Sequence, residues 1–142
     1  MIRFEYIDAS ILVKPFLPER DSDSARSLLA ETRQPIASNL ARLEVIATLN
    51  RAAGSGRLRP HTLLAALATF DEQWTRMGQL SMDAVQHHTI QVCSRRKLRA
   101  ADAIHLGSCL HLRSLGAEVV LLCADQELLA AAKAEGFDCR TP

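Results

Sequence analysis

The sequence predicts an α/β fold in which a small, mostly parallel sheet is flanked by helices. Short stretches with the apolar pattern of strands alternate with longer stretches that have the spacing of helices. One strand candidate, Glu118–Cys123, is apolar without interruption after its first residue, as in a parallel strand buried on both faces. Strands and helices that alternate along a chain are typical of layered α/β folds.

Length and composition predict a single domain over residues 1–142. Apolar residues make up 48% and charged residues 23% of the chain, which is ordinary for a soluble globular protein and unlike a disordered one. No apolar run approaches the roughly 20 residues of a membrane span. The segment Met1–Tyr6 lacks the pattern of a signal peptide. We therefore expect a cytoplasmic protein with free cysteine thiols, because no C-x-x-C pair occurs.

Five short segments are predicted to be strands. The first alternates apolar and polar residues and ends at Asp8. The apolar segment that follows it, Ala9–Leu17, is broken by Pro15 and Pro18. The predicted strands are Ile2–Ile7, Pro35–Ala37, Gln79–Met82, Glu118–Cys123 and Phe137–Arg140.

Six helices are predicted from apolar spacing and from their end signals. We expect Ser22 or Asp23 to cap the first, Ser38 or Asn39 to cap the second, and Pro60 to open the third. Glycines that suit helix ends follow four of them, at Gly54, Gly78, Gly116 and Gly136. The predicted helices cover residues 22–32, from the Ser38 or Asn39 cap to about 53, 60–77, 83–96, 100–115 and 126–135.

Two aspartates stand where predicted strands end. Asp8 follows the first strand and Asp125 follows Glu118–Cys123. Ligands of parallel sheets bind at the carboxyl ends of the strands, so both aspartates are expected at one edge of the sheet. The alternative is that each is an ordinary turn or helix-cap residue.

Two further acids lie on predicted helices. Glu44 is surrounded by apolar residues, and a buried acid is costly unless it is paired or bound to a metal. Its alternative place is a narrow polar stripe shared with Thr48 and Arg51. Asp102 falls in the first turn of a helix, where the helix dipole alone favours a carboxylate.

Four carboxylates in similar apolar surroundings indicate a cation site. Carboxylates that are brought together repel one another, and a divalent ion removes that cost. Mg²⁺ and Mn²⁺ prefer carboxylate oxygen and water. Such ions promote the hydrolysis of phosphodiesters by activating water.

At these residues the sequence resembles the PIN-domain family, specifically the VapC-like toxins of bacterial toxin–antitoxin pairs. The similarity extends over essentially the whole chain and is carried by the segments Tyr6–Glu19, Asn39–Arg51, Leu98–Leu106 and Ala124–Leu128. It implies a PIN-like fold and a ribonuclease that uses Mg²⁺ or Mn²⁺ to hydrolyse RNA. The implied metal-holding acids, which together carry catalysis, are Asp8, Glu44, Asp102 and Asp125.

Three neighbours of these acids are compared with the family pattern. Ser10, a small hydroxyl residue two positions after the first acid, is retained and is expected to orient water or an acid. Cys123 stands where members often have Thr or Ser. Gln126 stands where an acidic or polar residue commonly follows the last Asp.

The resemblance also implies partners. A toxin of this kind is silenced by a VapB-like antitoxin, and we expect the antitoxin to place an Arg or Lys among the four acids. We further expect a homodimer that pairs through the helix face bearing Phe70 and Trp74, for which core packing is the alternative.

Several other interpretations remain open at this stage. The run Arg95–Arg99 is either a phosphate contact or a solvated helix end. His105 and Cys109 share a helix face with Asp102, which could hold zinc, but a polar-edge histidine and a packed cysteine are the simpler interpretation. A receiver-like fold would require an acidic neighbour of Asp8, which is missing. A catalytically silent PIN-fold module that binds protein or RNA is the alternative function.

Overall fold

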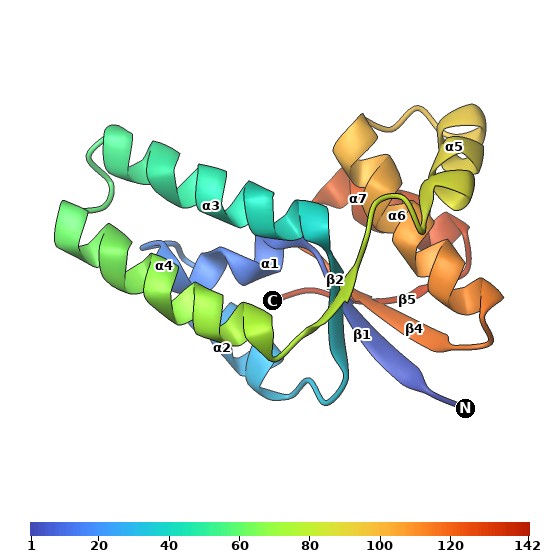
Figure 1. The fold of residues 1–142 in the computed structure, drawn as a ribbon, viewed down its shortest axis with the longest axis horizontal. Coiled ribbons are helices and arrows are strands. Elements are labelled where there is room, and N and C mark those ends of the chain that lie inside the picture. Colours follow the sequence, from blue (N-terminus) through green and yellow to red (C-terminus); the bar gives the residue numbers. More distant parts are fainter.

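The computed structural model describes residues 1–142 and has three layers, with a parallel sheet between two groups of helices (Figure 1). The expected α/β fold is therefore confirmed. The sheet has five strands in the order β3-β2-β1-β4-β5, and every neighbouring pair is parallel. The strands are β1 (Arg3–Ile7), β2 (Pro35–Ser38), β3 (Gly78–Leu80), β4 (Glu118–Leu122) and β5 (Asp138–Arg140).

The first four α-helices lie on one side of the sheet and the last three on the other (Figure 1). Helices α3 and α4 form a hairpin that extends away from the sheet (Figure 1). None of the helices combines the length and apolarity that a bilayer span requires. The helices are α1 (Ala9–Leu12), the 3-10 helix η1 (Lys14–Phe16), α2 (Ser22–Ala30), α3 (Asn39–Gly54), α4 (Pro60–Thr75), α5 (Gln86–Arg95), α6 (Ala100–Ser114) and α7 (Gln126–Ala134).

The two central strands supply both hydrophobic cores. Successive side chains of a strand point to opposite faces of the sheet. Tyr6 and Leu121, which are paired in register, enter the core beneath α5–α7. Ile7 and Leu122, one position further, enter the core beneath α1–α4. Because both faces are covered, the strands are apolar on both sides, and the pattern of β4 predicted this.

The start of α2 and the end of α3 differ from the predicted helix ends. Ser22 does not cap α2; its hydroxyl donates to the carbonyl oxygen of Leu17 at 2.6 Å. The N-cap residue is Asp21, whose carboxylate instead contacts Lys14. Gly54 lies inside α3, and the left-handed backbone is at Gly56, with φ of 82°. Ser38, in contrast, caps α3 as predicted, because its hydroxyl accepts the backbone N–H of Leu40.

Helix α5 begins later than predicted. The sequence predicts a start at Asp83, whereas the helix begins at Gln86. Residues 82–85 form a turn in which the Ser81 hydroxyl accepts the backbone N–H of Ala84. A serine side chain that binds nearby backbone offers the chain an alternative to helix.

The expected dimer face is wrong. Phe70 and Trp74 are 1% and 3% exposed and belong to the core beneath α1–α4. Their rings lie 5.9 Å apart, and Phe16 packs edge-on against Phe70. The i, i+4 aromatic pair therefore docks α4 onto the rest of the layer, and a second copy of the chain cannot reach it.

Helices α5 and α6 pack closely because Gly107 has no side chain. A Cβ atom at Gly107 would lie 2.4 Å from the Thr89 hydroxyl and 2.7 Å from the Thr89 Cα atom. At the far end of α5, Arg95 and Arg96 bind the two carboxylate oxygens of Glu135 at 2.7 Å and 2.6 Å. These contacts fix α5 between α6 and the end of α7.

We expect Gly107→Ala to lower the free energy of unfolding by about 2–3 kcal/mol, because backbone atoms at Thr89 must move to admit the methyl group. Urea denaturation measures the change. Gly54→Ala is the matched control, since a Cβ there meets nothing within 4 Å, and it should leave stability equal or higher by about 0.5 kcal/mol. Equal stability of Gly107→Ala and the parent protein would contradict the close packing.

We expect Glu135→Gln to cost about 1 kcal/mol of stability at neutral pH. Burial raises the pKa of Glu135. The hydrogen bond from Arg96 and the charges of Arg95, Arg96 and Arg113 lower the pKa by more than burial raises it, so the net pKa lies below its usual value. This contribution is present above the unfolded pKa of about 4.3 and disappears as the pH falls through the lower folded pKa.

Thermal melts at successively lower pH test this expectation. The difference between the parent protein and Glu135→Gln should shrink below pH ~4.3. Glu127→Gln, an exposed acid on α7, is the control and should show no such difference. A difference in melting temperature between the parent protein and Glu135→Gln that stays constant at every acidic pH contradicts a stabilising ion pair at Glu135.

Candidate active site

The sheet order brings the candidate acids to one edge. Strands β1 and β4 are neighbours, although they lie far apart in the sequence. Asp8 immediately follows β1, and Asp125 lies just beyond β4, where it caps α7. The chain moves outward from β1 to β3 and then returns to β4 on the other side of β1. This reversal of strand order is where parallel sheets place their ligand sites.

Asp8 is 5% exposed and is held by its neighbours. The hydroxyl of Ser10 donates to Asp8 Oδ2 at 2.7 Å and accepts the backbone N–H of Ala124 at 3.0 Å. The Cys123 thiol lies 3.4 Å from the same carboxylate oxygen. Burial, followed by the charge of Asp8, raises the pKa of the Cys123 thiol, so the group stays protonated and can donate. Cysteine here therefore retains a weak donor at the position of the usual hydroxyl.

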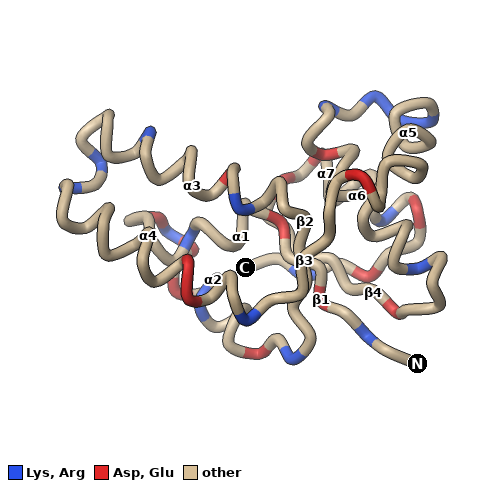
Figure 2. Tube along the Cα trace, viewed as in Figure 1, with Lys and Arg blue, Asp and Glu red and all other residues tan.

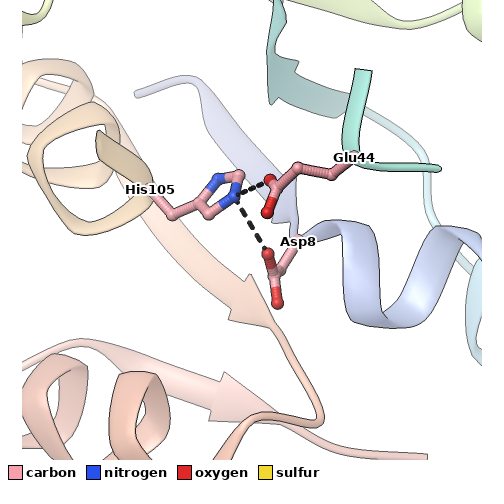
Figure 3. A group of neighbouring side chains, drawn as sticks. All are labelled: Asp8, Glu44 and His105. Atoms are coloured by element: carbon pink, nitrogen blue, oxygen red, sulfur yellow. Dashed lines mark hydrogen bonds and ion pairs between the residues drawn. The ribbon is translucent and has the colours of Figure 1, made fainter. Parts of the chain in front are cut away.

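His105 joins Asp8 to Glu44 (Figure 3). Its Nε2 atom lies 2.6 Å from Glu44 Oε1 and 3.2 Å from Asp8 Oδ1. The histidine is 1% exposed, whereas the Glu44 side chain is 32% exposed. The polar stripe considered for Glu44 is wrong, because Glu44 turns inward to His105 while Thr48 and Arg51 bind each other.

Tyr6 holds the other side of the histidine ring. Its hydroxyl lies 2.7 Å from His105 Nδ1 and accepts the backbone N–H of Ser38 at 3.2 Å. Burial lowers the pKa of His105. The Glu44 hydrogen bond and the charges of Asp8, Glu44 and Asp102 raise the pKa by more than burial lowers it, so the net pKa lies above its usual value. The ring is thus fixed at both nitrogens within a negatively charged pocket.

Asp102 is 9% exposed and has an unpaired oxygen. Its Oδ2 atom is buried without any hydrogen-bond partner. Burial raises the pKa of Asp102, and the nearby charges of Asp125 and Asp8 raise it further, against opposing effects of Arg99 and His105. Buried carboxylates normally have partners, so the unpaired Oδ2 of Asp102 is an exception that an ordinary packing role does not explain.

The structure brings together only part of the predicted set. Ligand atoms of Asp8, Glu44 and His105 lie within 4.8 Å of one another. Asp102 and Asp125 are near enough for their charges to interact but lie outside this group. Asp125 Oδ1 accepts the backbone N–H of Leu128 at 3.1 Å, so the capping role considered for it is confirmed.

The sequence interpretation assigned His105 to a polar edge, and that is wrong. The available signal was its spacing, because His105 lies three residues after Asp102 and such residues are neighbours on a helix. Cys109, in contrast, is buried in the core beneath α5–α7 as a packed cysteine. The zinc alternative finds no support, since the group that could hold a metal contains no cysteine.

The basic run Arg95–Arg99, at the end of α5 and in the loop before α6, divides into two parts. Figure 2 shows Lys and Arg along the loop that joins α5 to α6. Arg95 and Arg96 bind Glu135 and serve the fold. Lys97 and Arg99 make no ion pair, and the charge of Arg99 acts on Asp102. Lys97 and Arg99 are therefore the exposed members of the run that are free for a further contact.

An apolar cavity lies away from these acids. It measures about 470 Å³ and is lined by residues of η1, α2 and α4, among them Phe16, Leu29 and Gln73. None of the four predicted acids lines it. The chemistry of the molecule is therefore concentrated at the carboxyl edge of the sheet rather than in this cavity.

Comparison with known proteins agrees with this architecture. The PIN domain profile matches residues 6–134 of the chain. Two proteins of Mycobacterium tuberculosis, ribonuclease VapC45 from strain CDC 1551 / Oshkosh and ribonuclease VapC49 from strain H37Rv, are each 32% identical over 136 residues. These matches cover 95% of this chain and 92% of each relative.

Solved structures share the fold at lower identity. FitAcB from Neisseria gonorrhoeae superimposes with a TM-score of 0.70 and 12% identity, covering 95% of both chains. A toxin–antitoxin complex from Klebsiella pneumoniae gives a TM-score of 0.64 and 16% identity, covering 89% of this chain and 90% of that one. The sequence matches and the shared fold together show that the chain belongs to the PIN-domain family and, within it, to the VapC-like proteins.

Proposed function

We propose that this protein, as a single PIN-like domain over residues 1–142, is a ribonuclease and the toxin of a toxin–antitoxin pair. The observation that carries the proposal is the 32% identity over nearly the whole chain to two ribonucleases. The cluster of Asp8, Glu44 and His105 at the carboxyl edge of the sheet supports it, because that edge is where such folds bind ligands.

The residues at this edge fit a divalent cation, Mg²⁺ or Mn²⁺. Asp102 Oδ2 is buried without a partner, and the charges of Asp8 and Asp125 reach it. The residues that would hold the cation, directly or through water, are Asp8, Glu44, Asp102 and Asp125. When bound, such an ion supplies Lewis acidity, which makes water a better nucleophile and offsets charge on phosphate oxygens.

The surrounding residues orient the acids. Ser10 fixes the rotamer of Asp8 through its 2.7 Å hydrogen bond and ties it to the loop after β4. Cys123 donates to the same oxygen, and the cap of α7 holds Asp125. Lys97 and Arg99 would contact RNA phosphates, and their exposure and their lack of an ion pair support this role.

The proposed partners are RNA, a VapB-like antitoxin and a second copy of the chain. A solved relative in fold is itself a toxin–antitoxin complex. An antitoxin Arg or Lys suits the acidic edge, since a guanidinium binds carboxylates at two points. A dimer cannot use Phe70 and Trp74 and needs exposed apolar residues such as Leu43 and Leu64.

We expect Asp8→Asn to fold normally but to cleave cellular RNA at least about 100-fold more slowly, because it removes a charge from the reacting edge. Cleavage by the parent protein should stop in EDTA and return with Mg²⁺ or Mn²⁺. Sequencing of the RNA ends identifies the cut sites. Asp138→Asn, an exposed strand residue, is the control and should retain full activity.

The alternative function, a catalytically silent PIN-fold module, predicts different results. It would bind RNA or an antitoxin equally well with and without EDTA and would release no new RNA ends. Cleavage by Asp8→Asn within about threefold of the parent protein would exclude the four-acid assignment.

In the metal-free protein we expect Asp102→Asn to raise the melting temperature by a few degrees, equivalent to about 1 kcal/mol. The substitution removes a buried charge that lacks a partner and repels its neighbours. Added Mn²⁺ should stabilise the parent protein more than the variant. Asp138→Asn is again the control. A lower melting temperature for Asp102→Asn would contradict a repulsive cluster.

A further inference from the structure

We infer that His105 is a direct ligand of the divalent ion, through Nε2, so that the site is a mixed nitrogen and oxygen site rather than one of carboxylates alone. The inference rests on the proposed metal-dependent ribonuclease and adds to it a ligand and a metal preference. The ligand atoms are Nε2 of His105, Oδ1 of Asp8 and Oε1 of Glu44, which lie within 4.8 Å of one another (Figure 3).

The convergence of these three atoms is the first argument. Each of the three atoms can donate a lone pair. Such atoms approach one another closely only when a proton or a cation lies between them. In the metal-free protein a proton on Nε2 has this role at 2.6 Å and 3.2 Å. A divalent ion satisfies the same three atoms. Glu44, whose side chain is 32% exposed, has room to move aside as the ion enters.

The support on the far side of the ring is the second argument. Histidines that bind metals are held at their other nitrogen, which fixes the ring. Here Nδ1 lies 2.7 Å from the Tyr6 hydroxyl. A phenol both donates and accepts, so Tyr6 can bond to Nδ1 with either nitrogen of the ring protonated. Tyr6 is fixed in turn by the backbone N–H of Ser38.

The unpaired oxygen of Asp102 is the third argument, and it is independent of the cluster. Asp102 is 9% exposed, lies one helical turn before His105 and leaves Oδ2 without a partner. Helix α6 thus presents two groups to the same region, one fixed and one unsatisfied. The charge of Asp102 acts on His105, so a cation bound at Nε2 would also offset the charge of this acid, which the His105–Glu44 ion pair leaves without a partner.

A nitrogen ligand changes which ion the site prefers. Mg²⁺ binds oxygen and keeps its water, while imidazole suits transition ions better. Loss of His105 should therefore weaken Mn²⁺ binding about tenfold or more and change Mg²⁺ binding by less than about threefold. Tyr6→Phe removes the hydroxyl that holds His105 Nδ1 but leaves the imidazole in place. It should lower the affinity for Mn²⁺ while the contact between Mn²⁺ and His105 Nε2 is preserved.

The test uses the whole metal-stripped chain with Mn²⁺ alone as probe. Continuous-wave electron paramagnetic resonance gives the affinity from free Mn²⁺, and competition gives the affinity for Mg²⁺. Pulsed measurements detect coupling of the bound ion to a nearby nitrogen nucleus. The parent protein should show this coupling, and labelling with ¹⁵N-histidine should replace it. His105→Gln should lose it, whereas His111→Gln, at the other end of α6, should keep it.

Each outcome separates the two proposals. Bound Mn²⁺ without histidine coupling in the labelled parent protein overturns the ligand assignment and leaves an acid-held metal ribonuclease intact. Coupling that survives His105→Gln and vanishes in His111→Gln places the ion elsewhere and also overturns it. RNA cleavage in EDTA refutes the proposed metal dependence itself. If His105→Gln fails to fold, the labelled parent protein decides.

Discussion

One buried contact joins the two helical layers at the edge of the sheet. His105 belongs to α6, Glu44 to α3 on the other side, and Asp8 to the end of the central strand between them. Nε2 of the histidine touches both carboxylates. The hydrophobic cores position the three elements separately, because Tyr6 and Ile7 enter different cores. The charged contact then joins the layers at this edge, where Tyr6 holds the histidine ring and Ser10 holds Asp8.

This arrangement places unsatisfied charge among well-satisfied neighbours. Ser10, Ser38 and Tyr6 all have hydrogen-bond partners close to the acids. Asp102 Oδ2 alone among the acids of this edge is buried and unpaired. A single buried polar atom without a hydrogen-bond partner, among neighbours that all have partners, points to function rather than to poor packing. The molecule tolerates the cost because two extensive apolar cores lie on either side of the sheet.

The fold was largely predictable because its signals are local. The alternation of strands and helices, the continuous apolar β4 and the glycines after α6 and α7 depend on neighbouring residues alone. Errors arose where a side chain had two uses. Ser22 binds Leu17 instead of capping α2, and Phe70 with Trp74 forms core instead of interface. The spacing of residues in the sequence indicates that they share one face of a helix. It does not indicate whether that face is covered by the same chain or by a partner.

The site was predictable in part for the same reason. Asp8 and Asp125 follow strands, so topology alone brings them to one edge. The contact of His105 with Glu44 joins residues 61 positions apart and depends on how two helices on opposite sides of the sheet approach each other. No spacing within either helix encodes that approach. The Asp102–His105 interval indicated a shared face, but not that the face turns toward the acids.

Histidine is well suited to this position for a chemical reason. An arginine or lysine between Asp8 and Glu44 would neutralise them permanently, because neither has a lone pair with which to bind a cation. An imidazole can carry a proton when no metal is present and offer its lone pair when one arrives. Tyr6 supports both states, since its hydroxyl at 2.7 Å from Nδ1 can donate or accept. The buried tyrosine, the histidine and the two acids therefore form one hydrogen-bonded unit, in which a proton on the ring offsets part of the negative charge when no ion is bound.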